Sequence, residues 1–130
     1  MRPQVLVVED DYNTRIAIRA MLEVAGCDVD EAADGEKAVG SIANKHFDVI
    51  ILDIALPKMS GTDVMEYIAS TQPKVLASIV VVTGLDVAEV RKLFPTVCET
   101  LSKPIMPSRL LASVRRCLRH TTGDAGIFVA

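Results

Sequence analysis

Three carboxylates, one hydroxyl and one amine stand at or shortly after the ends of strand-like runs, most of them apolar. In chain order these residues are Glu9, Asp10, Asp53, Thr83 and Lys103. If the apolar runs are parallel strands of one sheet, their carboxyl ends share an edge and these side chains converge there. Asp53 is the most informative, because an ionised carboxylate next to a buried strand is costly unless it is paired or bound to a metal. The pattern therefore predicts one polar site.

The expected charge balance of this site points to a divalent cation. Three carboxylates would meet a single amine, Lys103, and two carboxylates 4 Å apart repel by about 4 kcal/mol at an effective dielectric constant near 20. The donors are hard oxygens, with no His or Cys among them, which favours Mg²⁺ over zinc. A metal ion, an ammonium and a hydroxyl together suit the oxygens of a phosphoryl group. We therefore predict phosphoryl transfer onto Asp53, with its carboxylate as the nucleophile.

Strand and helix patterns alternate along the chain and must position these residues. Continuous apolar, β-branched runs at 5–8, 49–52 and 79–82 are typical of strands covered on both faces. Weaker strands are expected at 28–31 and 98–101, and helices at 12–25, from Asp34 onward, at 62–70, between Asp86 and Pro95, and at 107–120. This alternation predicts a doubly wound α/β fold, with a five-stranded parallel sheet flanked by five helices.

The first helix carries two kinds of residue at helical spacing. Its inward face is expected to hold Ile16, Ala20, Val24 and their neighbours. Arg15, Arg19 and Glu23 recur four residues apart, and we expect them on the opposite, solvent-facing side.

The composition describes one ordinary domain. The chain has 130 residues, with 14 lysines and arginines against 17 aspartates and glutamates, so its formal charge is −3. Scattered basic residues and a negative net charge predict no direct nucleic-acid binding. No apolar run approaches the roughly 20 residues that cross a bilayer, and the first residues lack the pattern of a secretory signal. We expect a cytoplasmic protein, with a domain at 1–121 and a tail at 122–130.

The cysteines and histidines suggest no further site. Cys27, Cys98 and Cys117 are odd in number and widely spaced, without a C-x-x-C pair. We expect all three to be reduced core residues. His46 and His120 are isolated in the sequence and are expected at the surface.

Four segments together resemble the response-regulator receiver domains of two-component signalling. They read VLVVEDD at 5–11, ILDIALPKMSG at 51–61, VTG at 82–84 and SKP at 102–104. The resemblance extends over nearly the whole chain. It implies a flavodoxin-like sheet of strand order 2-1-3-4-5 and a chain that signals through contact with a downstream protein.

The resemblance also implies roles for the clustered residues. Asp53 would accept phosphate from a histidine kinase or a histidine phosphotransfer protein, and Asp10 would bind Mg²⁺ directly, while Glu9 assists mainly through water. The carbonyl oxygen of Ala55 would be a further metal ligand. Thr83 and Lys103 would contact phosphoryl oxygens, and Lys103-Pro104 would be a cis peptide, which is plausible for X-Pro. Beyond its own phosphorylation and slow loss of phosphate, no enzyme activity is implied.

Some positions depart from the family pattern. Thr100 stands where an aromatic side chain often couples the site to the output face, and the short connection from Thr83 to Lys103 predicts a reduced or irregular fourth helix. The side chains that would orient a hydrolytic water, two residues after Asp53 and two after Thr83, are Ala55 and Leu85. Neither offers a hydrogen bond.

Other interpretations make different predictions. A haloacid-dehalogenase-like phosphatase also uses an Asp nucleophile and Mg²⁺, but it needs a second acid that Asp53-Ile54-Ala55 lacks. Neither glycine-rich nucleotide-binding motif occurs. A pseudo-receiver that binds partners without phosphorylation is a further alternative. The chain could also be a receiver domain cut from a larger regulator or a hybrid histidine kinase.

Overall fold

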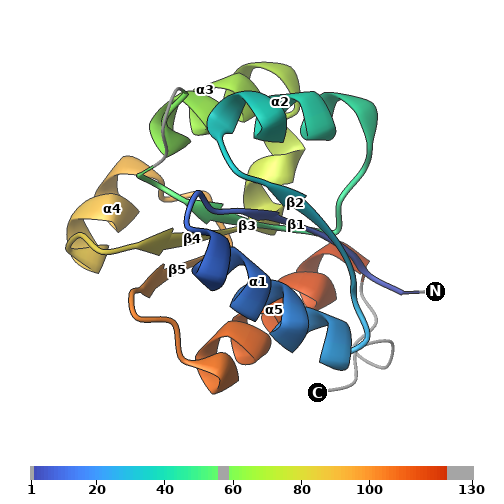
Figure 1. Ribbon diagram of the computed structural model, residues 1–130. Helices are drawn as coiled ribbons and strands as arrows, with labels where there is room; N and C mark the ends of the chain where they lie inside the picture. The colour runs from blue at the N-terminus through green and yellow to red at the C-terminus, as the bar shows by residue number, and fades with distance from the viewer. Residues whose placement is uncertain (1, 56–58, 123–130) are drawn as a thin grey trace.

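One parallel sheet forms the centre of the molecule (Figure 1). The computed structural model describes residues 2–55 and 59–122. Its five strands lie in the order β2-β1-β3-β4-β5, which confirms the predicted fold class and strand order. They are β1 (Gln4–Val8), β2 (Asp28–Ala32), β3 (Val49–Asp53), β4 (Ile79–Thr83) and β5 (Glu99–Ser102).

Helices cover both faces of this sheet. α1 and α5 lie on one face, and α2 and α3 lie on the other (Figure 1). The α-helices are α1 (Tyr12–Val24), α2 (Gly35–Asn44), α3 (Gly61–Thr71), α4 (Val87–Leu93) and α5 (Pro107–Thr122). α4 has only seven residues, as the short connection predicts. A 3-10 helix at Pro73–Ser78, which the sequence patterns did not predict, joins α3 to β4.

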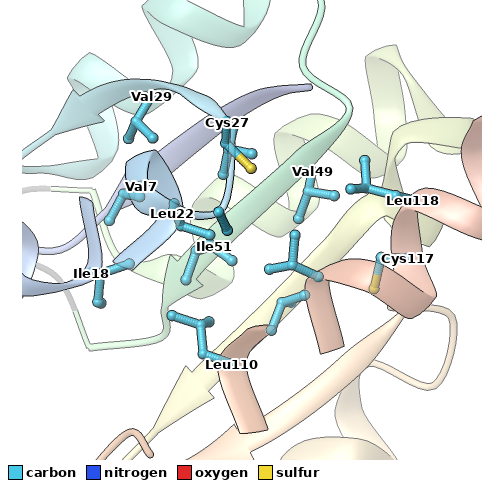
Figure 2. Close-up of a cluster of buried hydrophobic side chains, with 14 of the residues drawn as sticks. Val7, Ile18, Leu22, Cys27, Val29, Val49, Ile51, Leu110, Cys117 and Leu118 are labelled. Atoms are coloured by element: carbon cyan, nitrogen blue, oxygen red, sulfur yellow. The ribbon is translucent and has the colours of Figure 1, made fainter. Parts of the chain in front are cut away.

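Alternating strand residues supply two separate cores. Val5 and Val7 face the α1–α5 side, where Figure 2 shows Val7 close to Ile18 and Leu22. Leu6 and Val8 face the side of α2, α3 and α4. Because the strands are buried on both faces, their sequences read as continuous apolar runs rather than alternating ones.

Side-chain caps fix where the helices begin. The carboxylate of Asp11 accepts a hydrogen bond from the amide of Thr14 at the start of α1, and Asp34 does the same for Lys37 in α2. α3 begins with a reciprocal capping box between Ser60 and Asp63. Caps of this kind satisfy amide groups that have no partner within the helix.

The expected inward face of α1 was wrong. Ile16 and Val24 are 38% and 88% exposed, and Ala20 is exposed as well. Ile18 and Leu22 are buried instead. Both stripes have helical spacing, so periodicity alone could not choose between them; the way α1 docks on β1 and β2 decides which stripe is covered.

The cysteine prediction was wrong for two of the three residues. Cys98 and Cys117 form a disulfide, with 6.0 Å between their Cα atoms. They are 19 residues apart in sequence and meet only because α5 packs back against the start of β5. Cys27 is a buried free thiol, as predicted.

Other differences from the predictions are small. The fifth strand begins one residue later than expected, and α5 reaches Thr122, past the expected end near 120. His46 is exposed, as predicted. The expected loop residues 56–58, the tail after 122 and the side chain of His120 lie outside what the structure describes. Among the described residues, no helix is both long and apolar enough to span a membrane.

Candidate functional site

The strand register brings the predicted site residues to one edge of the sheet. Val8 of β1 pairs with Leu52 of β3, so Glu9 and Asp53 follow at the same level. Asp53 in turn pairs with Val82, and Thr83 with Ser102, which directly precedes Lys103. The strand ends of β1, β3, β4 and β5 therefore supply the site together, as the sequence predicts.

Lys103 bridges two carboxylates from different strands. Its Nζ atom lies 2.9 Å from Oδ2 of Asp53 and 3.1 Å from Oε1 of Glu9. Both acids are buried, while about one third of the lysine side chain is exposed. Burial alone lowers the pKa of Lys103, but its hydrogen bonds to Asp53 and Glu9 outweigh this effect and raise the pKa above its usual value. The amine therefore stays charged and holds the two acids together.

Three acids of this edge form a compact group. Carboxylate oxygens of Glu9, Asp10 and Asp53 all lie within 4.8 Å of one another. Burial raises the pKa of Glu9 to about 7, and repulsion from Asp53 adds to the rise, although a hydrogen bond from the amide of Asp11 lowers it in part. One lysine thus leaves the excess negative charge of the group uncompensated, and the oxygens are of the type that Mg²⁺ prefers.

Backbone groups hold Asp53 and the turn after it. The amide of Ala55 donates to Oδ1 of Asp53 at 3.0 Å, and the amide of Gly61 donates to the carbonyl oxygen of Ile54 at 3.1 Å. A Cβ atom on Gly61 would lie 2.6 Å from Cα of Ile54. Only glycine lets the start of α3 approach the strand end this closely.

Thr83 is buried at the end of β4. Its Oγ1 atom accepts a hydrogen bond from the amide of Leu85 at 2.9 Å, which leaves the hydroxyl proton available to a ligand. Its carbonyl oxygen accepts from the amide of Lys103 at 2.8 Å. The backbone hydrogen bond between Thr83 and Lys103 therefore fixes the hydroxyl and the ammonium relative to each other. The Lys103-Pro104 bond is cis, as the resemblance implies.

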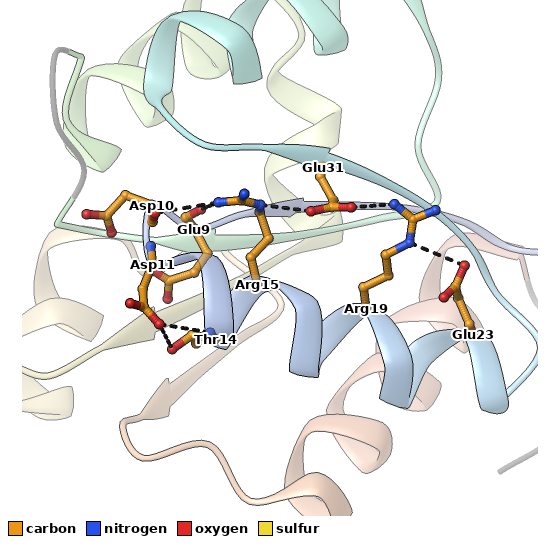
Figure 3. A network of polar contacts seen from close by, with 8 residues as sticks. All are labelled: Glu9, Asp10, Asp11, Thr14, Arg15, Arg19, Glu23 and Glu31. Carbon is orange, nitrogen blue, oxygen red and sulfur yellow. Dashed lines mark hydrogen bonds and ion pairs between the residues drawn. The ribbon is translucent and has the colours of Figure 1, made fainter.

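Arg15 links the backbone of Glu9 to β2, a role that the sequence pattern did not indicate. Its Nε atom donates to Oε1 of Glu31 at 2.8 Å, and its Nη1 atom donates to the carbonyl oxygen of Glu9 at 2.9 Å (Figure 3). Arg19 pairs with the second oxygen of Glu31 and with Glu23 (Figure 3). The arginines expected to face solvent thus tie α1 to β2 and to the acidic loop; their spacing alone contained no signal for this.

A cavity of about 630 Å³ lies beside Lys103. It runs between α1 and the segment after β5, and its lining includes Asn13, Ala17, Met21 and Ile105. The acidic site therefore opens next to a largely apolar hollow, not onto a uniformly polar surface.

A parallel sheet of order 2-1-3-4-5 with an acid group and a bridging lysine at its carboxyl edge defines a receiver-type signalling domain. The family model "Response regulator receiver domain" matches residues 5–115. The chain belongs to this family.

Relatives and solved structures agree with this assignment. The chain is 36% identical to the response regulator MprA of Mycobacterium sp. (strain KMS) over 128 residues, which is 97% of this chain and 55% of that protein. It therefore spans about half the length of such curated relatives. The signal receiver domain of a LuxO repressor protein from Vibrio parahaemolyticus matches with a TM-score of 0.83, 31% identity and 93% of each chain covered.

A third similar protein is a receiver domain solved with metal. It is the receiver domain of the sensor histidine kinase PA1611 from Pseudomonas aeruginosa, with a magnesium ion coordinated in its active-site cleft. The TM-score is 0.78 and the identity 27%, with 95% of this chain and 100% of that chain covered.

Proposed function

We propose that this chain receives a phosphoryl group on Asp53 in a Mg²⁺-dependent reaction and passes the signal on by protein contact. The observation that carries the proposal is the bridge from Lys103 to two buried carboxylates, 2.9 Å from Asp53 and 3.1 Å from Glu9. The bridge keeps an ionised nucleophile and a cation together in a site that is sheltered but open on one side. This is the combination that phosphoryl transfer to a carboxylate needs.

In the proposed reaction, an oxygen of Asp53 attacks phosphorus in line with the leaving nitrogen of a phosphohistidine. The P–N bond breaks, and the imidazole nitrogen keeps the electron pair. Lys103 and the hydroxyl of Thr83 bind phosphoryl oxygens, while the amide of Ala55 orients the aspartate by its hydrogen bond to Oδ1. Positioning and charge supply the catalysis, so no other acid or base is required.

The acid group fits a magnesium ion. We propose that Glu9, Asp10, Asp53 and the carbonyl oxygen of Ala55 hold it, with Glu9 acting mainly through water. The carboxylate oxygens within 4.8 Å of one another support this, because a divalent cation relieves their repulsion. When bound, Mg²⁺ offsets charge on the phosphoryl oxygens. The similar PA1611 receiver holds magnesium in its cleft.

The proposed phosphodonor is a histidine kinase or a histidine phosphotransfer protein. The largely apolar cavity beside Lys103 supports this proposal, because a surface of this kind suits a helical protein donor. The proposed output is contact with a downstream protein in the cytoplasm, without direct nucleic-acid binding by this domain, taken as residues 1–121. The curated relatives are about twice as long, so a second proposal is that this receiver acts inside a longer regulator or hybrid kinase.

The test is labelling of the purified chain with acetyl phosphate and Mg²⁺, read by intact mass. We expect one phosphoryl group on the native chain and none on Asp53→Asn, because an amide cannot accept it. Asp10→Asn should label about tenfold more slowly. Asp30→Asn is the matched control, since this half-buried acid pairs with Lys45 away from the site.

Equal labelling of native and Asp53→Asn chains would show that the acceptor lies elsewhere. No labelling of the folded native chain by acetyl phosphate or by phosphohistidine donors would favour a pseudo-receiver that acts by binding alone.

A further inference from the structure

The disulfide between Cys98 and Cys117 lies at the start of β5, and Lys103 follows the other end of the same strand. We propose that these cysteines are a reversible, peroxide-responsive thiol pair that sets how firmly β5 and Lys103 are held. This redox input goes beyond the proposed phosphorylation. It uses residues outside the acidic site.

The position of the disulfide means that it restricts the motion of β5 most directly. β5 has four residues and is the last strand of the sheet, so β4 is its one strand partner among the described residues. The bond joins Cys98, immediately before β5, to Cys117 in α5. The closed loop therefore contains all of β5 and also Lys103. Short edge strands belong to the parts of a fold that open locally, and a cross-link restricts such opening.

Packing beside Thr100 is loose, although Glu99 at the start of β5 accepts hydrogen bonds from Ser113 and Arg116 of α5. The hydroxyl of Thr100 is buried and has no hydrogen-bond partner among the described residues. The same residue lines a hollow of about 340 Å³ between α4 and β5 and another of about 360 Å³ between α4, β5 and α5. An edge strand with open space on this side gains more from a covalent link than a fully packed one does.

The fold does not need the bond to keep α5 in place. Leu110, Val114 and Leu118 of α5 are at most 1% exposed and belong to the core against the sheet. That apolar contact persists when the disulfide is reduced. Reduction is therefore expected to loosen β5 locally, without unfolding the domain.

The two sulfurs differ in access. Cys98 is half-buried and lines the hollow of about 340 Å³, which is open to solvent. Cys117 is 0% exposed. An oxidant therefore meets Cys98 first, and Cys117 is placed to react with the product.

The proposed oxidation balances with a peroxide as the oxidant. The thiolate of Cys98 attacks one oxygen of H₂O₂; the O–O bond breaks, and a sulfenic acid and water form. The thiolate of Cys117 then attacks the Cys98 sulfur and displaces hydroxide, which leaves as water with the proton lost by the thiol. Two thiols and one H₂O₂ give one disulfide and two water molecules. A dithiol reductant reverses this by attacking the accessible Cys98 sulfur.

Cys27 provides an internal control. It is 0% exposed, and burial raises the pKa of its thiol to about 11. Only a small fraction of this thiol is ionised near neutral pH, and its burial keeps oxidants away, so it should stay reduced. Disulfides in reducing compartments are usually transient or redox-sensing, which agrees with a reversible pair in a signalling domain.

The first experiment treats the full chain, purified in dithiol, with a small excess of H₂O₂ and follows intact mass and disulfide peptides. We expect a Cys98–Cys117 disulfide in the native chain and in Cys27→Ser, with reversal by a dithiol under native conditions. Cys117→Ser should stop at a trappable sulfenic acid on Cys98. Cys98→Ser should remain unoxidised.

The second experiment compares amide hydrogen exchange of the oxidised and reduced native chain. Exchange in β5 and at Lys103 should be about tenfold slower in the oxidised form, whereas β1 should be unchanged. Because both experiments use unphosphorylated protein, a failure of Asp53 labelling leaves their result intact.

Three results would each overturn the proposal. They are a folded native chain that peroxide leaves as a dithiol, a disulfide that resists native reduction, and equal exchange of β5 in the two redox forms.

Discussion

Arg15 of α1 is hydrogen-bonded to Glu31 of β2, with 2.8 Å between Nε and Oε1. The other end of the same guanidinium donates to the carbonyl oxygen of Glu9, at 2.9 Å. The second strand supplies no residue to the acidic group itself. Through this arginine it nevertheless positions the loop that holds Glu9 and Asp10.

Replacement of Arg15 should therefore weaken Mg²⁺ binding without removing a ligand. We expect Arg15→Gln to lower the Mg²⁺ affinity about tenfold, because supporting contacts orient metal ligands. Arg19→Gln is the control, since Arg19 pairs with the Glu31 and Glu23 carboxylates and not with the carbonyl oxygen of Glu9. Isothermal titration measures both. Equal affinities for the two variants would contradict the role of Arg15.

The Arg15–Glu31–Arg19 cluster should contribute stability that is lost in acid. A hydrogen bond from Arg19 lowers the pKa of Glu31 below 4.5, against the effect of burial and with help from Arg15. The Glu31 carboxylate therefore binds a proton more readily in the unfolded chain than in the folded one. Its contribution to the free energy of unfolding is present above pH 4.5 and is lost as the pH falls through the folded-state pKa. We expect Glu31→Gln to be about 1 kcal/mol less stable near pH 7.

Urea unfolding across the pH range tests this prediction. The difference between the native chain and Glu31→Gln should shrink as the pH falls below 4.5. A difference that stays constant with pH would assign the loss to packing.

The acid group should cost stability when no metal is bound. Asp10 is exposed and lies within 4.8 Å of two other carboxylates, so its charge is mainly repelled. We expect Asp10→Asn to raise the free energy of unfolding by up to about 1 kcal/mol in EDTA. The same variant should lose most of the stabilisation that Mg²⁺ confers. Thermal unfolding with and without Mg²⁺ measures both effects; destabilisation in EDTA would mean that Asp10 has a favourable partner.

The disulfide should contribute to global stability as well as to β5. Cross-linking residues 19 apart is expected to add about 3 kcal/mol by restricting the unfolded chain. In urea, the free energies of unfolding of the oxidised and reduced native chains should differ by this amount, whereas a dithiol should not change that of Cys98→Ser. If a dithiol leaves the urea midpoint of the native chain unchanged, the disulfide does not contribute.

The phosphorylated form should be long-lived. Hydrolysis of an acyl phosphate needs a water aligned opposite the Asp53 oxygen, and neither the Ala55 nor the Leu85 side chain can orient one. Leu85 is 66% exposed, so a polar replacement there is tolerated. Ala55→Asn combined with Leu85→Glu should shorten the phosphoryl lifetime several-fold in Mg²⁺. Equal decay rates would assign the lifetime to backbone groups.

Much of the fold and most of the candidate site were predictable from local sequence. Apolar, β-branched runs such as 79–82 are typical of strands covered on both faces. A parallel sheet then places the residues after each strand at one edge, so Asp53, Thr83 and Lys103 converge wherever the exact strand boundaries fall. These predictions depend on short-range patterns and on one general rule of topology.

Tertiary structure alone decided the contacts that depend on how one element docks against another. α1 carries two apolar stripes at helical spacing, and the way it packs against the sheet buries Leu22 and leaves Val24 exposed. The same packing places Arg15 next to Glu31, and the packing of α5 against the start of β5 places Cys117 next to Cys98. Each of these pairs joins residues far apart in the chain. Sequence spacing does not encode such distances, because packing of whole faces, rather than local propensity, determines which side chains meet.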